Sequence, residues 1–554
     1  MAATEQLFDR DEAFPRLSDD LTAPLDAVGS RRPLTAGELL FKAGDRHSAF
    51  YVVLSGQVAI VDAYGTKKER VLGVHAAQRF VGELSLVTGQ PTYTTAVVRE
   101  DGEAIELSRE QLLAVVGANQ KLGDVLITAF MARRAILIGL GSGLRLVGSH
   151  LSPDGRRLRE FLTRNRIPHT FIDLEIDTNA ELLLQKLSVA PDETPLVLRG
   201  SKIMRNPSNL EVAAALNLVP KATPDRVFDT IVVGAGPAGL GAAVYAASEG
   251  LTTALVDSVA IGGQASTSSR IENYLGFPAG ISGSELAERA AVQATRFGTD
   301  SAVPITARRL ALEDGYHVVE LDGGQRLRGR SVVLATGASY RRLAVPRLEE
   351  FEGAGVYYAA TEVEAQMCES SPVIVVGGAN SAGQAAVFLA RRVGRVSLLV
   401  RGADLAAGMS RYLVDQVLGE PAIDLHLRTQ VRALHGNGDL RGATVECDGS
   451  SKRVDARAIF VFIGAEPCTG WLDDALAIDD SGFVLTGQDL QLTHLDPAGD
   501  GRERAPLPLE TSRPGVFAAG DVRSGSIKRV ASAVGEGAMA VRMIHEYLAL
   551  LALA

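Results

Sequence analysis

The residues best suited to chemistry in this chain of 554 residues are glycines that follow a short apolar run. Gly234, Gly236 and Gly239 have the spacing GxGxxG and come directly after residues 231–233. In such a loop the first glycine permits a tight turn, the second lets the backbone approach a pyrophosphate, and the third lets the next helix pack on the strand. The free amides at the start of that helix bind phosphate. The pattern predicts a dinucleotide site, in which Asp257 ends the following strand and accepts from ribose hydroxyls.

Further short motifs follow this loop in a fixed order. They contain Gly263 and Gln264, then Asn273, then Thr336 and Gly337, and finally Gly520 and Asp521. Together with residues 234–240 they resemble the low-molecular-weight thioredoxin reductases over about residues 226–550. The resemblance implies that these residues bind FAD, that an NADPH domain interrupts the FAD domain, and that the protein forms a homodimer. It also implies hydride transfer from nicotinamide to flavin.

A second glycine loop begins at Gly377, again after an apolar run. Alanine stands at the middle glycine position of its fingerprint, at Ala379, and crowds the closest approach to a pyrophosphate. No acid ends the next strand; Arg401 stands there and could pair with a 2′-phosphate, which favours NADP over NAD. We therefore expect NADP at Gly377, Ser381, Ala382 and Arg401, with NAD as the alternative cofactor and a solvated surface charge as the alternative role of Arg401.

The dithiol of the resembled family is missing. Those reductases carry a redox-active CxxC between a tyrosine-containing strand end and the NADPH domain, and here Ala359 and Glu362 take the two cysteine positions. Neither alanine nor a carboxylate can undergo thiol–disulfide exchange. Cys368 lies nearby, but because no second thiol is close in sequence we interpret it as a small buried residue. We assign no catalytic side chain, and electrons must leave the flavin without a CxxC relay.

The β-rich segment that includes residues 49–65 is followed by Gly82-Glu83-Leu84. These features resemble cyclic nucleotide-binding domains over about residues 15–140. In that family the glutamate accepts from a ribose hydroxyl and an arginine nine positions later pairs with the cyclic phosphate; Thr92 stands at that position here. A threonine hydroxyl offers one neutral hydrogen bond in place of a bidentate charged pair. Gly82, Glu83, Leu84 and Thr92 are therefore a candidate site for a nucleotide-like effector, with a purely local role of Glu83 as the alternative.

Strand and helix patterns alternate between about residues 143 and 220, which predicts a small α/β unit. Thr194-Pro195 before a strand, and the segment 206–210, resemble the thioredoxin and glutaredoxin folds. The loop that would carry their active dithiol, residues 149–152, reads Ser-His-Leu-Ser, and serine is not redox active. The resemblance implies a redox-silent unit that docks on other domains or serves as a spacer between them.

The elements that position these residues predict a multidomain chain. We expect an N-terminal β-roll with helices, a small thioredoxin-like α/β unit, and two Rossmann-like α/β domains for FAD and NAD(P). The expected bounds are 1–140 for the cyclic nucleotide-binding-like domain, 141–222 for the thioredoxin-like unit, 223–340 and 466–554 for the FAD domain, and 341–465 for the NAD(P) domain.

Composition and charge exclude several classes of protein. Lysines and arginines number 56 against 66 acids, a net charge of −10, which disfavours nucleic acid and anionic membranes as partners. The sequence shows neither a membrane-spanning apolar run nor a signal peptide, and its three cysteines suit a reducing cytoplasm. The common zinc-site spacings HExxH and CxxC do not occur, so we expect no metal.

These observations favour an FAD-dependent NAD(P)H oxidoreductase of the thioredoxin reductase type, with an unknown electron acceptor and a possible effector at the N-terminal domain. One alternative is electron transfer like that of ferredoxin–NADP reductases, because enzymes of that kind on this scaffold also lack the CxxC. Two others are a thioredoxin reductase that uses other cysteines and a non-catalytic sensor of flavin redox state or of an effector.

Overall fold

The chain divides into two compact units, after Gly337 and after Cys468: residues 338–468 form one unit, and the segments on either side form the other. Both are seen in a computed structural model. The structure describes residues 10–45, 49–66, 69–82, 86, 91–140, 143–149, 152–177, 184–185, 189–190, 193–199, 202–216, 218, 226–268, 271, 273–352, 355–358, 360, 365, 368, 370–437, 439–472, 475–490 and 504–553.

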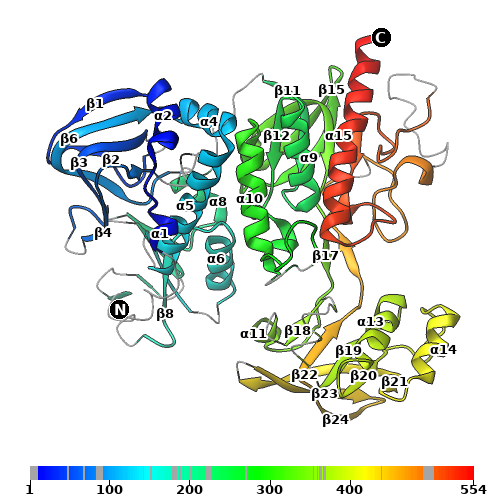
Figure 1. Ribbon diagram of the computed structural model, residues 1–554. Helices are drawn as coiled ribbons and strands as arrows, with labels where there is room; N and C mark the ends of the chain where they lie inside the picture. Colours follow the sequence, from blue (N-terminus) through cyan, green and yellow to red (C-terminus); the bar gives the residue numbers. More distant parts are fainter. Residues whose placement is uncertain are drawn as a thin grey trace. The chain divides into compact units, whose positions relative to one another are not determined.

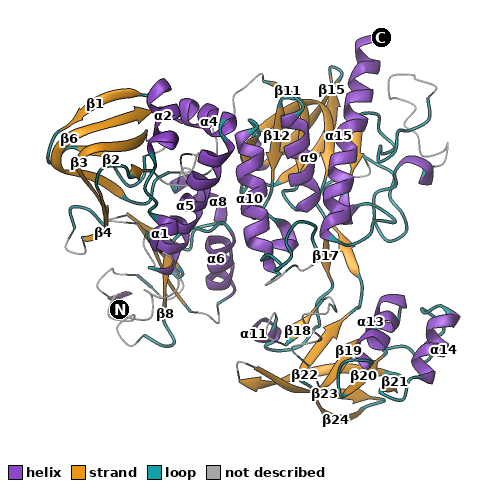
Figure 2. Ribbon diagram, in the orientation of Figure 1, coloured by secondary structure: helices purple, strands orange, loops and turns teal. Residues whose placement is uncertain are grey.

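The larger unit contains a sheet with the strand order β13-β12-β11-β16-β15-β14, in which β27 also pairs with β16. Strands β11, β12 and β15 of this sheet are labelled in Figure 1. Its parallel strands are β11 (Val227–Val233), β12 (Thr253–Val256), β13 (Asp300–Ala302), β16 (Arg326–Leu334) and β27 (Val516–Ala518). The antiparallel strands β14 (Ala307–Glu313) and β15 (Tyr316–Leu321) extend it. Figure 2 shows α9 (Pro237–Ser248), α10 (Gly283–Arg296) and α15 (Val530–Leu553) together beside this sheet.

Small residues let α9 and α15 pack closely. A side chain at Gly241 would place its Cβ 2.9 Å from the Val534 carbonyl oxygen, and one at Gly537 would place it 2.1 Å from the Ala238 carbonyl oxygen. Alanines of α9 and the aromatic rings of Phe517 and Tyr547 fill the same core. The sequence therefore builds a tightly packed layer behind the first glycine loop.

Residues 338–468 contain a second parallel sheet, in the order β18-β25-β19-β20-β21. Its strands are β18 (Val356–Tyr357), β19 (Pro372–Val376), β20 (Arg395–Leu399), β21 (Ile423–His426) and β25 (Ala458–Val461). The helices α13 (Asn380–Ala390) and α14 (Arg411–Gly419) share one apolar core with it. A second core joins it to the antiparallel strands β22 (Thr429–Asn437), β23 (Asp439–Cys447) and β24 (Ser450–Asp455). At the boundary, β17 (Ala338–Tyr340) pairs with β26 (Ala465–Pro467).

The N-terminal region is a β-roll with helices. Its main strand order is β1-β6-β3-β4, with β2 on β6 and β5 on β3. The strands are β1 (Ser30–Leu34), β2 (Leu39–Phe41), β3 (Phe50–Asp62), β4 (Arg70–His75), β5 (Phe80–Val81) and β6 (Thr95–Leu107), and the helices are α1 (Arg10–Ala13), α2 (Asp19–Val28), α4 (Arg109–Ala118) and α5 (Gln120–Gly139). The patterning over residues 108–140 suggests one helical stretch. The structure breaks it at Asn119, whose side chain caps α5 by accepting from the Leu122 amide.

A middle region follows, with the strand order β10-β9-β7-β8. Its elements are β7 (Leu144–Gly148), α6 (Pro153–Arg164), β8 (His169–Asp173), β9 (Leu196–Arg199), β10 (Lys202–Arg205) and α8 (Asn209–Ala215). Strands β7 and β8 are parallel, and β9 is antiparallel to both β7 and β10. The Thr194–Pro195 peptide bond directly before β9 is cis.

Among the helices of the described residues, none combines the length and the apolar character that a membrane crossing requires.

Candidate functional site

The residues predicted to bind a dinucleotide lie at one edge of the first sheet. Strands β11, β12, β16 and β27 are mutually parallel neighbours, so their carboxyl ends meet at the same edge. The segments that follow these ends contain Gly234, Asp257, Thr336 and Asp521. The fold thus brings together motifs that are spread over almost 300 residues of sequence, at the place where open parallel sheets bind ligands.

Packing within the protein accounts for two of the three glycines in the first loop. Gly234 has a φ of +108°, and a Cβ there would lie 2.2 Å from the Ala335 carbonyl oxygen. A Cβ at Gly239 would lie 1.7 Å from the Gly234 carbonyl oxygen. Both distances are far below van der Waals contact, so the tight turn and the close helix packing require glycine at both positions.

Gly236 differs from both of them. Its φ is −72°, which any residue can adopt, and the nearest atom to a Cβ there would be the Gly263 α-carbon at 3.9 Å. Gly236 is the N-cap of α9, followed by Pro237 at the first helical position. The space that a side chain would fill lies where a helix N-terminus directs its amides, which fits the pyrophosphate of a dinucleotide.

Asp257 organises the backbone around this space. Its Oδ2 accepts from the Ala235 amide at 2.8 Å, and its Oδ1 accepts from the amides of Val259 at 2.9 Å and Ala260 at 3.1 Å. Burial raises the pKa of this carboxyl, and the three amides oppose that shift. The carboxylate therefore joins the glycine loop to the segment after β12, in addition to the ribose contact that the sequence predicts.

That segment is also bonded directly to the glycine loop. The Gly262 amide donates to the Ala235 carbonyl at 2.7 Å, and a Cβ on Gly263 would come within 2.8 Å of the Gly236 α-carbon. Gln264 and Asn273 are exposed, and Thr336 and Gly337 are partly exposed, all beside strands or turns of the same unit. These residues therefore reach the surface of the unit, where a ligand can approach them.

The turn that contains Asp521 is held by a residue that sequence patterns did not reveal. Glu536, on α15, accepts from the Gly520 amide at 2.7 Å and forms an ion pair with Arg523 at 2.6 Å. Burial raises the pKa of the Asp521 carboxyl, the Lys528 charge lowers it, and the Glu536 charge raises it. Nothing in the local sequence distinguishes Glu536 from other helical glutamates, so only the fold reveals its role.

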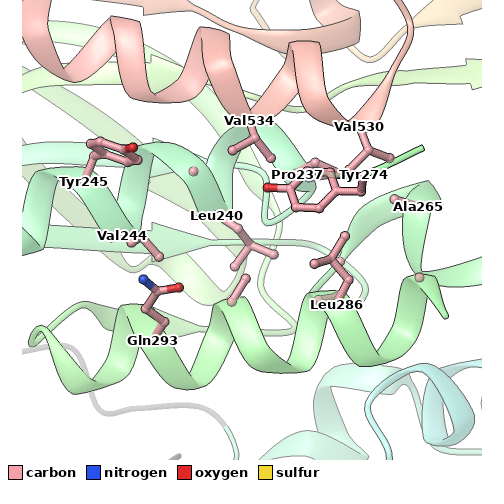
Figure 3. Close-up of a pocket in the computed structure, with 15 residues that line it drawn as sticks. Pro237, Leu240, Val244, Tyr245, Ala265, Tyr274, Leu286, Gln293, Val530 and Val534 are labelled. Atoms are coloured by element: carbon pink, nitrogen blue, oxygen red, sulfur yellow. The ribbon is translucent and has the colours of Figure 1, made fainter. Parts of the chain in front are cut away.

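An apolar cavity of about 260 Å³ lies between α9, α10 and α15 (Figure 3). Leu240 and Val244 of α9 face Leu286 of α10, and Tyr274 and Val534 also line it. No charged side chain lines this cavity, so it does not suit a phosphate. The strand ends, and not this cavity, therefore fit the dinucleotide.

In the second unit, the loop after β19 repeats the arrangement. A Cβ at Gly377 would lie 2.3 Å from the Phe462 carbonyl oxygen, so this position also requires glycine. Ala379 is the N-cap of α13 with a φ of −104°, a backbone conformation that alanine adopts without strain. Ala382 is buried in the core, Ser381 is exposed in the first turn, and Arg401 is exposed two residues beyond β20. The exposed hydroxyl and guanidinium are placed to meet a ligand at this edge.

The positions of the missing dithiol, Ala359 and Glu362, lie outside the described residues. Directly before them, the ring of Tyr358 stacks on the ring of Tyr340 with 5.7 Å between centroids, and its hydroxyl donates to Glu352. Burial and the Glu352 carboxylate raise the pKa of Tyr358, so the phenol stays neutral. Cys368 is 2% exposed and belongs to the core of the second sheet, as its sequence context predicted.

In the N-terminal region, Glu83 and Leu84 lie outside the described residues. Arg133 of α5 is buried and donates to the Gly82 carbonyl at 2.7 Å, so it fixes the start of this motif. Thr92 is 1% exposed, and its hydroxyl donates to the Lys42 carbonyl at 2.7 Å. In this conformation the only hydroxyl proton of Thr92 is used within the protein, so Thr92 does not replace the arginine that pairs with a cyclic phosphate.

Comparison with known proteins places both regions. A family model described as "Pyridine nucleotide-disulphide oxidoreductase" matches residues 228–537, and one described as "Cyclic nucleotide-binding domain" matches residues 31–119. The thioredoxin reductase of Treponema pallidum (strain Nichols) is 32% identical over 323 residues, which cover 58% of this chain and 97% of that protein. The NADPH-dependent thioredoxin reductase 3 of Arabidopsis thaliana is 29% identical over 368 residues, covering 63% of this chain and 65% of that protein.

A solved structure agrees with these sequence matches. The crystal structure of thioredoxin reductase from Streptococcus pyogenes MGAS5005 superposes with a TM-score of 0.50 at 29% identity, covering 58% of this chain and 98% of that one. The similarity therefore extends from the sequence to the fold.

Proposed function

Because the chain belongs to the pyridine nucleotide-disulphide oxidoreductase family, we propose that it is an NADPH-dependent flavoprotein oxidoreductase in which no CxxC relay takes electrons from the flavin. Enzymes of the thioredoxin reductase type in this family use FAD and NADPH. One observation carries the proposal. The chain has two glycine loops at the ends of parallel strands, but it has Ala359 and Glu362 at the positions of the dithiol cysteines.

The residues of the first sheet fit FAD. The loop 234–239 and the start of α9 would hold the pyrophosphate, because Gly236 leaves open space there and helix amides bind phosphate. Asp257 is placed to accept from the adenosine ribose, and Asp521 to accept from a ribityl hydroxyl. Gly263, Gln264, Asn273, Thr336, Gly337 and Gly520 complete the proposed contacts.

The second loop fits the pyridine nucleotide. Gly377, Ser381 and Ala382 would hold its pyrophosphate at the start of α13, and Arg401 would pair with the 2′-phosphate that distinguishes NADPH from NADH. FAD, when bound, takes two electrons from the nicotinamide and can release them singly or as a pair. The chain itself would hold both dinucleotides. It has no dithiol at residues 359 and 362 to accept electrons from the flavin.

The acceptor is therefore a separate protein or small molecule. An acceptor screen tests this: NADPH oxidation is measured with thioredoxin, a one-electron iron complex, a ferredoxin and a quinone in parallel. We expect turnover with at least one acceptor other than thioredoxin. Thioredoxin reduction at about 1 s⁻¹ or faster would show an ordinary reductase and contradict the proposal. A flavin that binds but turns over with none of them would favour the redox sensor.

We also propose that the N-terminal domain binds a nucleotide-like effector. The match of residues 31–119 to cyclic nucleotide-binding domains and the fixed position of Gly82 support this. The buried hydroxyl of Thr92 argues for an effector other than a cyclic monophosphate held by arginine. Melting temperatures measured with cyclic mononucleotides, cyclic dinucleotides and nucleoside diphosphates test this, and no shift with any of them would contradict it.

The middle region is proposed to be a redox-silent thioredoxin-like unit. Its strand order β10-β9-β7-β8, with only β7 and β8 parallel, supports this assignment. Ser149 bonds through its hydroxyl to Glu175 at 2.6 Å, and residues 150 and 151 lie outside the described residues. Absence of glutathione-dependent disulfide reductase activity in the purified protein would agree with this role, and its presence would contradict it.

A further inference from the structure

The end of α6 reaches the segment that follows β12. Arg164 ends the helix and donates from Nη2 to the Gly263 carbonyl at 3.1 Å. Asn165, the next residue, donates from Nδ2 to the Val259 carbonyl at 2.8 Å. These bonds join residues 99 and 94 positions apart. They connect the middle region, which lies outside the part matched by the oxidoreductase family model, to the edge of the proposed flavin site.

Each carbonyl belongs to a peptide unit with a role at that edge. A peptide bond is planar and trans, so fixing its C=O also fixes the opposite direction of its N–H. Asn165 holds the Val259 carbonyl, and the amide of the same peptide unit, on Ala260, donates to Asp257 at 3.1 Å. Arg164, together with the Ser266 hydroxyl at 2.8 Å, holds the Gly263 carbonyl and so helps to fix the direction of the Gln264 amide, which belongs to a residue expected to contact FAD.

A third contact makes this docking specific. Arg166 forms an ion pair with Glu288 of α10 at 2.8 Å, and the Glu288 side chain is only 8% exposed. Burial raises the pKa of Glu288, and the charges of Arg166 and Arg134 oppose the shift. A buried carboxylate stays charged only where nearby cations offset the cost of its burial, so Glu288 fixes the position of Arg166 and with it the end of α6 on α10.

The charge of Arg164 also acts on the flavin edge. Its side chain is 20% exposed, and its charge is among the causes that lower the pKa of buried Asp257. Positive charge at this edge favours binding of an anionic pyrophosphate. Arg164 therefore acts on the edge in two ways, through the carbonyl that it holds and through its charge.

We propose that Arg164 and Asn165 are positioning residues for FAD, which hold the Val259–Ala260 and Gly263–Gln264 peptide units in the orientation that the dinucleotide requires. The proposal rests on the flavin site assigned above. It makes FAD affinity depend on a region that the family's shared domain does not contain.

The test measures FAD binding to the full-length chain after the flavin has been removed. The dissociation constant is obtained from quenching of flavin fluorescence for the wild type, Arg164→Ala, Arg164→Lys and Asn165→Ala. We expect the two alanine variants to bind FAD about tenfold more weakly, because each loses a partly buried hydrogen bond to a carbonyl at the flavin edge. Arg164→Lys should bind more tightly than Arg164→Ala, since the ammonium retains the charge and can donate one bond.

Glu160→Gln is the matched control. Glu160 is 64% exposed and pairs with Arg164 at 3.4 Å, so this variant removes the surface ion pair and leaves both carbonyl bonds intact. Its dissociation constant should stay within about twofold of the wild type, as expected for a surface pair. Visible circular dichroism of the bound flavin, recorded at saturating FAD, should change in Arg164→Ala and stay unchanged in Glu160→Gln.

A folded Arg164→Ala chain with wild-type FAD affinity and an unchanged flavin spectrum would overturn the proposal. If thermal melting shows that this variant does not fold, Asn165→Ala decides: wild-type affinity there overturns it equally. A wild-type chain that takes up no FAD is a different outcome, because it counts against the proposed flavin site itself.

Discussion

The Asp257 carboxylate accepts a hydrogen bond from the Ala235 amide at 2.8 Å, which ties the end of β12 to the turn after β11. The other carboxylate oxygen holds Val259 and Ala260, so one side chain joins both segments of the proposed flavin edge. At the other end of the same two strands, Asp229 of β11 accepts hydrogen bonds from Thr252, at 2.9 Å from the Thr252 amide and at 2.7 Å from the Thr252 hydroxyl. The two aspartates are a natural pair for testing where the cofactor binds.

Asp257→Asn should weaken FAD binding by about tenfold or more, because an amide cannot satisfy three N–H donors and leaves a buried amide without a partner. Asp229→Asn removes a similar carboxylate at the opposite end of the strands, away from the proposed site, and should leave the affinity for FAD near that of the wild type. The measurement is the flavin-to-protein ratio after purification, followed by the dissociation constant for FAD. Equal losses in both variants would mean that Asp257 supports only the general fold.

Gly236→Ala should fold and yet fail to bind FAD. The backbone at Gly236 suits alanine, and outside the adjacent residues and the backbone of α9 itself the nearest atom to the added methyl is 3.9 Å away, so the melting temperature of the flavin-free chain should not fall. Gly239→Ala is the contrasting variant, because its methyl would lie 1.7 Å from a carbonyl oxygen. It should lower the melting temperature whether or not FAD is present. Wild-type FAD affinity in Gly236→Ala would place the pyrophosphate elsewhere.

The two glycine loops were predictable from sequence because their requirements are local. Gly234 and Gly377 both have positive φ, at +108° and +147°, and both follow apolar strands, so spacing and residue type are sufficient. The bond from Arg164 to the Gly263 carbonyl could not be predicted in this way. It joins a side chain to a main-chain atom in another part of the chain, and no local pattern encodes such a partner.

Two other features depended on tertiary packing. Thr92 was a candidate ligand by its position in a motif, and only the fold shows that its hydroxyl is buried against the Lys42 carbonyl. Glu536 holds the Gly520 amide from a helix that begins ten residues later in the chain. The sequence indicated which segments bind the cofactor, whereas the residues that brace those segments became visible only with the fold.

Arg401→Ala should reduce the preference for NADPH over NADH about tenfold, because a charge-assisted bond to the 2′-phosphate is lost. The change should appear in the KM for NADPH, with that for NADH little affected. Arg395→Ala is the control: Arg395 begins β20, the strand that ends two residues before Arg401, and its side chain pairs with Asp424. If Arg401→Ala leaves the ratio of kcat/KM values for the two nucleotides unchanged, Arg401 is a surface charge.

The N-terminal domain should lose stability in mild acid through His75. This side chain is 1% exposed, and burial, with the charges of Arg133 and Arg79, lowers its pKa to about 3. The unfolded chain takes up a proton below about pH 6.5, while the folded chain does not until about pH 3. The contribution of neutral His75 to the stability of the folded domain is therefore complete above pH 6.5. It is lost as the pH falls from 6.5 towards 3, at about 1.4 kcal/mol per pH unit.

The ring centroids of Phe14 and His75 lie 5.5 Å apart. His75→Leu keeps a side chain packed against Phe14 and removes the titratable imidazole. Chemical unfolding of both chains at pH 7 and pH 5 should show a shallower pH dependence in the variant. The difference between the two slopes isolates His75 from the carboxylates that also titrate in acid. Identical slopes would mean that His75 already takes up its proton in the folded state.

The most direct test of the central claim is an anaerobic titration of the purified flavoprotein with NADPH, followed by flavin absorbance. A flavin without a dithiol partner takes up one pair of electrons, so bleaching should be complete at about one NADPH per FAD. Consumption of about two NADPH per FAD would reveal a second two-electron centre such as a redox-active disulfide. That result would contradict an enzyme whose electrons leave the flavin without a protein dithiol.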